Sequence, residues 1–399
     1  MIRPDEDRMA WPSTSLRIAG VVAGAVAVLL AASIAGAQGQ PATGQPATGQ
    51  PAAGQPAPLT RSFFELPVTV DRASIKLEAM EIRPRGAGPF PLAVIAHGKD
   101  GGEDQRRAQT AIGMTSRALA FAKRGFVAVV AMRRGYGTSQ GQYAENDGTC
   151  ETTRYLEASR AGARDLVATV AAAAARPGVD RTRILVVGDS VGGINALALA
   201  AMPPPGVLGV VNFAGGRGGD PAEPGKVCQP DRLIEAVRSF GAAGKLPTLW
   251  IYAENDQLFS AALARQMYQS YVGPGGKATL AMLPPIGRDG HRVFMEGGAA
   301  WREPLDAFLR QHGLPTLQPT AAATPALPAG LGANGRAGFQ AYLQSPLPYK
   351  AFASSGDGLT GWAASPRARD EARRAALANC QKAGRACDVV SEVVEIEDR

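Results

Sequence analysis

Aromatic side chains make up only 6% of the 399 residues, and this scarcity limits which partners the chain can recognise. Proteins that bind single-stranded nucleic acid stack bases on aromatic rings set among clustered cations. The net charge here is +7, but the basic residues are scattered through the sequence and form no run. The composition therefore argues against a nucleic-acid partner and indicates a mildly basic, solvated surface.

Cysteine and histidine are also scarce, with four and three copies. No two cysteines form CxxC and no histidine lies near a cysteine, so the ligand spacing of a zinc site is absent from the sequence. An even number of cysteines is typical of disulfides in an oxidising compartment, and four cysteines allow three pairings. We expect Cys150 to pair with Cys228 and Cys380 with Cys387, because each pair then lies within one module.

Phosphate-binding loops are not indicated either. The glycine-rich stretch RRGYGTSQG, residues 133–141, lacks the lysine and the spacing of the GxxxxGK(S/T) pattern. No cofactor and no metal ion are therefore expected.

The first part of the chain is typical of an export signal. An uncharged apolar stretch follows Arg17 and ends in Ala35-Gly36-Ala37, which fits a signal-peptidase site. Residues 1–37 are therefore expected to be a signal peptide. The stretch is also about long enough to span a bilayer, so an uncleaved membrane anchor is the alternative. Either outcome predicts export, to the periplasm or cell envelope of a bacterium or to the medium.

Residues 38–58 repeat the unit Gly-Gln-Pro-Ala and contain no apolar side chain larger than proline. Such a segment has little to bury, and we interpret it as a disordered tether. Residues 314–335 are rich in Pro, Ala and Thr and are expected to form a second linker. Residues 336–399 follow as a small α+β module with strand signals on both sides of one helix.

Residues 59–313 alternate strand-like and helix-like segments. The strands, such as PLAVIAHG, FVAVVA, RILVVG and LWIYA, are almost continuously apolar. This pattern predicts an α/β fold with a mostly parallel sheet covered by helices on both faces. The stretch VTVDRASIKLEAMEIRP alternates in polarity and predicts a hairpin at the sheet edge, while residues 104–125 predict one helix.

The motif GDSVG joins one of these apolar strands to an apolar helix. A serine in such a tight turn is pushed out of the plane of the sheet, and only small residues fit at Gly188 and Gly192. The first N–H groups of the following helix point back towards Ser190, where they favour a developing negative charge. The context of strand, turn and helix therefore predicts that Ser190 is a nucleophile.

A serine hydroxyl needs a base, and histidine is the natural choice. His97 follows an early strand, and His312 lies at a helix C-terminus, where a solvated capping role is usual. His291 follows the last core strand, so its place in the chain suits a base.

The base in turn needs a carboxylate. Asp256 comes just past a buried strand, with Glu254 as the alternative, and Asp289 is close to the histidine in sequence. The order Ser190, Asp256, His291 is the order of the triad in α/β-hydrolases.

The chain resembles the α/β-hydrolase superfamily, in particular its dienelactone hydrolase-like and prolyl oligopeptidase-like branch. The resemblance rests on VIAHGKDGG, RRGYGTSQG, VVGDSVGG, IYAENDQLF and GRDGHRVF, in that order. It implies that the backbone N–H of Val191 and that of Lys99, or else of Gly98, form the oxyanion hole. Dienelactone hydrolases in the strict sense have cysteine where this chain has Ser190, so dienelactone itself is not implied as the substrate.

The expected function is that of an exported serine hydrolase that cleaves small carboxylic esters through an acyl-enzyme. A serine peptidase or amidase is the alternative within the same chemistry, and a catalytically inactive envelope-binding protein is the alternative outside it. The C-terminal module resembles small secreted domains of unknown function with a paired-cysteine helix. That resemblance suggests binding to an envelope component, whereas membrane contact is expected only if the N-terminal segment stays uncleaved.

Overall fold

The computed structural model describes residues 59–317, 325–355, 357–383 and 385–398. The predicted signal peptide and the predicted tether, residues 1–58 together, lie outside the described residues. Within the described ranges, no helix combines the length and the apolar character needed to cross a bilayer.

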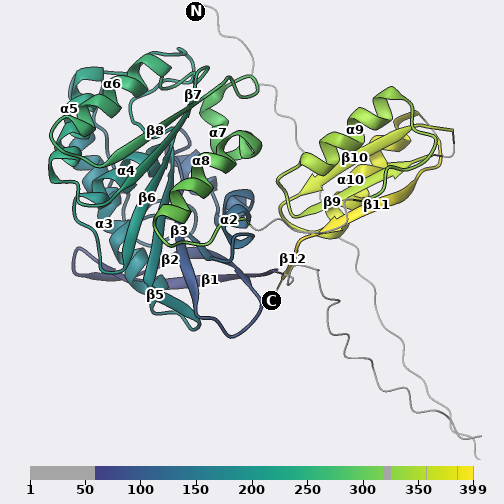
Figure 1. The fold of residues 1–399 in the computed structure, drawn as a ribbon, viewed down its shortest axis with the longest axis horizontal. Helices are drawn as coiled ribbons and strands as arrows, with labels where there is room; N and C mark the ends of the chain where they lie inside the picture. Colours follow the sequence, from purple (N-terminus) through teal and green to yellow (C-terminus); the bar gives the residue numbers. More distant parts are fainter. Residues whose placement is uncertain (1–58, 318–324, 356, 384, 399) are drawn as a thin grey trace, which may run out of the picture. The chain divides into compact units, whose positions relative to one another are not determined.

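Strands and helices alternate along most of the chain (Figure 1). The strands are β1 Leu59–Val70, β2 Ala73–Pro84, β3 Phe90–Ala96, β4 Val127–Ala131, β5 Val179–Asp189, β6 Val207–Phe213, β7 Thr248–Ala253, β8 Ala278–Leu283, β9 Tyr349–Ser354, β10 Thr360–Ser365, β11 Asp388–Val394 and β12 Ile396–Asp398. The α-helices are α1 Glu103–Ala108, α2 Thr115–Ala122, α3 Tyr155–Ala174, α4 Val191–Ala200, α5 Pro230–Ala243, α6 Ala261–Val272, α7 Val293–Glu296, α8 Gly298–Gln311, α9 Ala333–Gln344 and α10 Arg369–Cys380. The short 3-10 helices are η1 Ala111–Met114, η2 Gly290–Arg292 and η3 Gln381–Ala383.

The main sheet has the strand order β12-β1-β2-β4-β3-β5-β6-β7-β8. Strands β4, β3, β5, β6, β7 and β8 run parallel to one another, and β2 is antiparallel to both β1 and β4. Helices α3 to α6 form one covering layer, and α2, α7 and α8 form the other (Figure 1). This arrangement is the α/β-hydrolase fold, so the predicted fold class and the predicted edge hairpin are confirmed.

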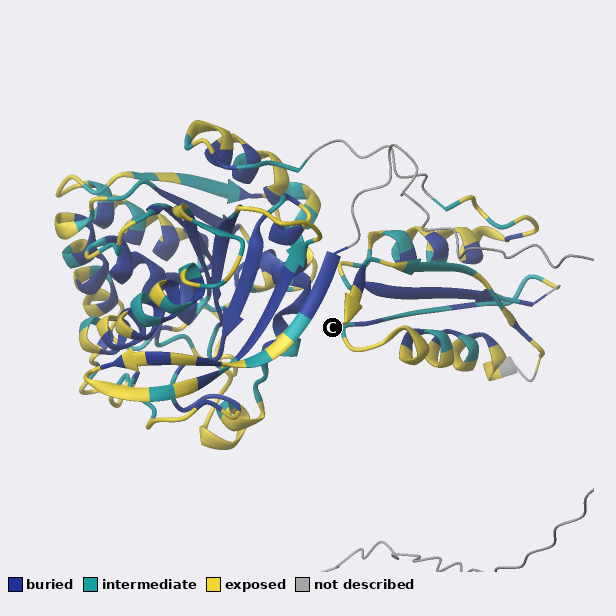
Figure 2. Ribbon diagram, turned by 90° about the horizontal axis from the view of Figure 1, so that it is seen from below, coloured by how far each residue is buried: buried dark blue, intermediate teal, exposed yellow. Residues whose placement is uncertain are grey.

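The central strands form the core because their sequences are apolar on both faces (Figure 2). In β4, with the sequence VAVVA, every residue is buried, and the same holds for β7. Full burial of one Val, Leu or Ile side chain contributes about 1.5–3 kcal/mol, so each of these short runs stabilises the sheet. The β1–β2 hairpin instead alternates buried and exposed residues over part of its length, as expected for a sheet edge with one solvated face.

The single helix predicted for residues 104–125 is wrong. The structure divides this segment into α1, η1 and α2, with an extended backbone at Gln109 and Thr110. The break follows from a tertiary contact, because the Ala111 N–H donates to the carboxylate of Glu78 over 2.8 Å. An N–H used in this way cannot continue the hydrogen bonds of a helix.

The C-terminal module has its own antiparallel sheet, in the order β10-β9-β11. Its helix α9 begins at Ala333, inside the segment expected to be a linker, and its rings Phe339 and Tyr342 pack against Phe352 of β9. The division of the chain into a catalytic domain, residues 59–313, and a separate module, residues 336–399, stays a prediction.

The last strand predicted from the sequence is split in two at Glu395. Residues before it pair with β9, whereas β12 after it pairs in parallel with β1 of the main sheet. The buried guanidinium of Arg61 holds this end of the chain, since it donates to both carboxylate oxygens of Asp398 over 2.7 and 3.0 Å. Strand β12 thereby pairs with residues 59–61 at the start of β1, part of an edge that would otherwise be open to pairing with another chain.

Candidate active site

Ser190 lies at the tip of the buried strand β5 and is the N-cap residue of α4. Its backbone has φ of 56° and ψ of −120°, a conformation that residues other than glycine rarely adopt. A Cβ added at Gly188 would overlap the carbonyl oxygen of Gly192, and one added at Gly192 would overlap that of Ala96. The flanking glycines are therefore required by the close approach of the backbone, which is the geometry of a nucleophile elbow.

His291 approaches this serine from η2, in the loop after β8. Its Nε2 lies 3.0 Å from Ser190 Oγ, and its Nδ1 lies 3.2 Å from each carboxylate oxygen of Asp256. With the Nδ1 proton directed at the carboxylate, Nε2 is free to accept the serine proton. The ring of Phe259 meets the imidazole edge-on at 5.4 Å and restricts its orientation.

Asp256 is the carboxylate that the fold brings to His291. It lies in the loop after β7, its side chain is fully buried, and its Oδ1 accepts the N–H groups of Leu258 and Phe259, both over 2.8 Å. The alternative Glu254 is exposed and pairs with Arg265.

Asp289 has a different role, although it is close to His291 in sequence. Its Oδ1 accepts the backbone N–H groups of His291 over 2.9 Å and of Gln257 over 3.1 Å. It thus caps η2 and links the loop after β8 to the loop after β7, and both of these loops carry residues of the site.

Burial alone would lower the pKa of His291, because it disfavours the charged imidazolium. The hydrogen bond and the charge of Asp256 outweigh burial, and the charges of Asp189 and Asp289 act in the same direction. The pKa of His291 is therefore raised above its ordinary value of 6.5. A raised pKa makes the imidazole a stronger base towards the serine proton, provided that the pH keeps it neutral.

The loop after β3 passes directly beside the serine. A Cβ added at Gly98 would lie 3.3 Å from the Cβ of Ser190 and 3.8 Å from its Oγ. Lys99 follows in this loop, and on the other side of the serine Val191 is the first residue of α4, where backbone N–H groups have no partner within the helix. Gly98 and Val191 thus lie beside Ser190, and the assignment of Val191, Lys99 and Gly98 to an oxyanion hole stays a prediction.

The remaining histidines take no part in this cluster. His97 is completely buried, donates through Nδ1 to Gly98 O over 2.7 Å and accepts the Arg133 N–H at Nε2 over 3.0 Å. Burial, together with the charge of Arg133, keeps its pKa well below 6.5, so it is neutral and braces the loop after β3. His312 caps the C-terminus of α8, as expected.

A buried polar network beneath the site was not predicted. Glu145, from the loop after β4, pairs with the fully buried guanidinium groups of Arg133 and Arg217. Asn195, on the helix that follows the nucleophile, donates to Glu145 over 2.9 Å and accepts from Arg217 over 2.7 Å. The one sequence signal for this network is the position of its arginines. Arg133 and Arg217 closely follow the ends of parallel strands, where the loops of such a sheet converge.

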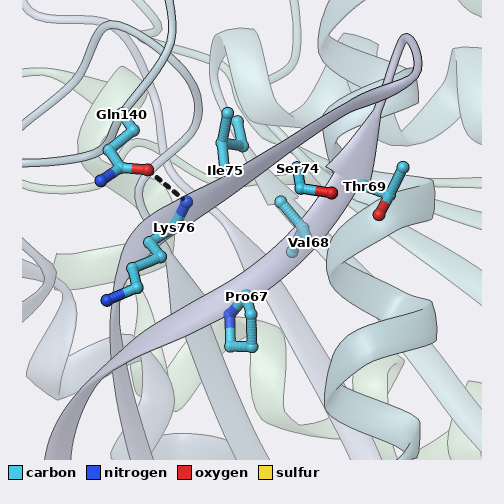
Figure 3. A pocket seen from close by; sticks show the side chains of 7 residues that line it. All are labelled: Pro67, Val68, Thr69, Ser74, Ile75, Lys76 and Gln140. Carbon is cyan, nitrogen blue, oxygen red and sulfur yellow. Dashed lines mark hydrogen bonds between the residues drawn. The ribbon is translucent and has the colours of Figure 1, made fainter.

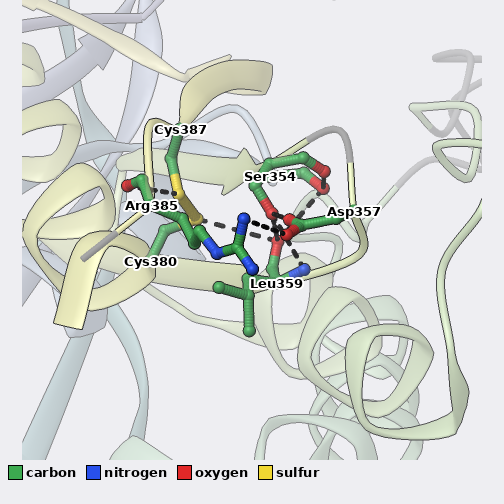
Figure 4. Close-up of a disulfide and its surroundings, with 7 residues drawn as sticks. Ser354, Asp357, Leu359, Cys380, Arg385 and Cys387 are labelled. Atoms are coloured by element: carbon green, nitrogen blue, oxygen red, sulfur yellow. Dashed lines mark hydrogen bonds and ion pairs between the residues drawn. A yellow bond between two sulfur atoms is a disulfide. The ribbon is translucent and has the colours of Figure 1, made fainter. Parts of the chain in front are cut away.

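The structure contains both predicted disulfides. Cys150–Cys228 joins the loop after β4 to the loop after β6, across a separation of 78 residues. Cys380–Cys387 joins the end of α10 to the segment before β11, close to Leu359 (Figure 4).

Two surface hollows lie apart from Ser190. One, of about 360 Å³, is lined by the β1–β2 hairpin and Gln140 (Figure 3). The other, of about 950 Å³, lies between α2, α7 and α8 on one side and residues 341–350 on the other. In the part of the chain that the structure describes, no three His, Cys, Asp or Glu side chains gather as a metal site would need.

The sequence matches the dienelactone hydrolase family over residues 77–284, which is 208 of its 399 residues. The chain therefore belongs to the dienelactone hydrolase family. A search of curated proteins finds no match.

Solved structures with a similar fold include the esterase Pf2001 from Pyrococcus furiosus, with 14% identity and a TM-score of 0.44 over 62% of this chain and 90% of that one. The acetyl xylan esterase from Paenibacillus sp. R4 has 15% identity and a TM-score of 0.45, over 65% of this chain and 90% of its own. The acylaminoacyl peptidase from Pyrococcus horikoshii has 15% identity and a TM-score of 0.45, over 66% of this chain and 43% of its own.

Proposed function

We propose that this protein is an exported serine hydrolase that cleaves carboxylic esters through an acyl-enzyme. The observation that carries the proposal is the hydrogen-bonded series from Ser190 Oγ to His291 Nε2 and from His291 Nδ1 to Asp256. Membership of the dienelactone hydrolase family supports hydrolysis as the reaction class. The two disulfides support export, because disulfides persist in oxidising compartments.

In the first half of the reaction, Ser190 Oγ attacks the ester carbonyl carbon while His291 Nε2 takes the serine proton. The carbonyl oxygen becomes an oxyanion, and the N–H groups of Val191 and Lys99 stabilise it. When the tetrahedral intermediate collapses, the bond to the alcohol oxygen breaks and the imidazolium returns its proton to the leaving alcohol.

In the second half, water attacks the acyl group on Ser190 as His291 removes a proton from it. Collapse of the second intermediate releases the carboxylic acid, and the serine recovers its proton from the imidazolium. Throughout, Asp256 keeps the Nδ1 proton in place and offsets the positive charge that forms on the ring.

The test uses purified protein and p-nitrophenyl esters of short and medium acyl chains, with the corresponding p-nitroanilides alongside. Ser190→Ala and His291→Ala should each lower kcat by at least about 10³-fold, because each removes a member of the triad. His312→Ala is the matched control and should leave kcat unchanged, since this histidine caps α8.

Full ester hydrolysis by Ser190→Ala would contradict the proposal. Hydrolysis of anilides but not of esters would instead identify a peptidase. If the folded wild type acts on neither class of substrate, the inactive envelope-binding protein becomes the better account.

A further inference from the structure

Asp147 connects two cations that belong to two different loops of the site. Its Oδ2 lies 3.0 Å from Lys99 Nζ, in the loop after β3, and its Oδ1 lies 2.5 Å from Arg217 Nη1, in the loop after β6. Asp147 itself belongs to the loop after β4, three residues before the disulfide-bonded Cys150. One carboxylate thus ties together three loops that meet at the C-terminal ends of the parallel strands.

The Arg217 end of this bridge is fixed. The guanidinium is fully buried, and besides Asp147 it donates to Glu145 over 2.6 Å, to Asn195 over 2.7 Å and to Ser159 over 3.0 Å. Because Asn195 lies on α4, the helix that begins directly after Ser190, the anchor is tied to the element that carries the nucleophile.

The Lys99 end of the bridge has fewer polar contacts than the Arg217 end. The root of the loop is held at His97, whose carbonyl accepts from Arg133 Nη1 over 2.7 Å. Beyond Gly98, the Lys99 side chain contacts Asp147 and lies over the ring of Tyr143 at 5.8 Å. Burial would lower the pKa of Lys99, but the charge of Asp147 outweighs it and raises the pKa, so the ammonium stays charged.

We propose that Asp147 is a positioning residue that fixes the oxyanion hole through the Lys99 side chain. The salt bridge sets where the Lys99 backbone N–H lies relative to Ser190, and Arg217 transmits the fixed position of the nucleophile helix to Asp147. This inference rests on the proposed function, because it assigns the Lys99 N–H to the oxyanion. In this inference, the carboxylate of Asp147 in the loop after β4 positions the backbone N–H of Lys99 in the loop after β3.

Lys99→Met separates this role from a merely structural one. It removes the ammonium, and with it the salt bridge to Asp147 and the cation over the Tyr143 ring, while the backbone N–H, most of the side-chain length and the Asp147–Arg217 contact remain. We expect kcat to fall by about tenfold to a hundredfold, less than the ~10²–10³ that loss of a whole oxyanion donor costs. KM should change by less than about twofold, because a donor that acts on the oxyanion contributes mainly in the transition state.

Four further variants complete the experiment, and each kcat is calculated per active site, with the active sites counted by titration with a fluorophosphonate. Lys99→Arg keeps a cation opposite Asp147 and should restore most of the activity. Asp147→Asn breaks the same ion pair and also weakens the one with Arg217, so it should be at least as slow as Lys99→Met, and the double variant should be no slower than Asp147→Asn. Lys226→Met removes an exposed ion pair with Glu223 and is the control that should behave as wild type.

A boronic acid inhibitor gives a second readout, because its adduct with serine is tetrahedral and negatively charged. The Ki of this inhibitor should rise in Lys99→Met by the same factor by which kcat/KM falls. If Lys99→Met has the kcat and Ki of the wild type while Ser190→Ala is inactive, the role of Asp147 is overturned but the proposed function stands. Full activity of Ser190→Ala would overturn the proposed function itself.

Discussion

Replacement of Glu145 by glutamine tests the buried network beneath the site. The wild-type carboxylate is 1% exposed and lies between the guanidinium groups of Arg133 and Arg217, with Asn195 donating a further hydrogen bond. Glu145→Gln keeps the size of the side chain and removes its charge. Two buried cations are then left with less compensation, which is the costly way to break an ion pair in a protein interior.

The pKa of Glu145 sets the size of the effect. Burial raises the pKa of this group, but the charges of Arg133 and Arg217 and the hydrogen bonds outweigh it and lower the value from 4.5 to about 2. Each unit is worth about 1.36 kcal/mol, so ionised Glu145 stabilises the fold by about 3 kcal/mol at neutral pH. Because the folded pKa is the lower one, this stabilisation is complete above pH 4.5 and disappears as the pH falls towards 2.

The assay is equilibrium unfolding in urea, followed by tryptophan fluorescence at pH 7 and repeated at successively lower pH. Glu145→Gln should lose about 3 kcal/mol of unfolding free energy at pH 7, and its deficit should shrink below pH 4.5. The control is Glu65→Gln, which breaks the exposed pair with Lys76 and should cost less than about 1 kcal/mol. If the two variants are equally stable at pH 7, the charge of Glu145 in the buried network does not stabilise the fold.

Three further predictions follow from other contacts. Gly98→Ala places a methyl group 3.3 Å from the Cβ of Ser190, so kcat in ester hydrolysis should fall at least about tenfold while the melting temperature changes little. Asp256→Asn should lower kcat by about 10⁴-fold and, because it removes the group that raises the pKa of His291, should move the acidic limb of the kcat/KM profile to lower pH. Arg61→Met leaves the carboxylate of β12 without its buried partner, so it should cost about 2–3 kcal/mol in urea unfolding and make the C-terminal module easier to release by limited proteolysis.

Much of the site could be predicted because its signals are local. Two glycines and an apolar strand indicate the turn that holds Ser190, and the structure shows why both glycines are needed. Asp256 could be preferred to Glu254 because it stands in the turn just beyond a strand, where parallel strands present their functional groups. The disulfide pairs could be chosen because each joins cysteines of one module.

The parts that could not be predicted depend on contacts distant in sequence. The helix expected for residues 104–125 is interrupted by Glu78, a residue of the edge hairpin. Glu145 and Arg217 lie 72 positions apart in segments that look like solvated loops, and only the fold buries their charges together. The interruption at Glu395 lets the last segment pair with β1, a partner more than 300 positions away for which the sequence carries no signal.

The most direct test of the central claim is to label the folded protein with a fluorophosphonate and to map the modified peptide by mass spectrometry, beside Ser190→Ala. We expect one adduct, on the peptide that contains Ser190, and no labelling of the alanine variant. Failure of the folded wild type to react, or equal labelling of Ser190→Ala, would show that the hydrogen-bonded series of Ser190, His291 and Asp256 does not activate this serine.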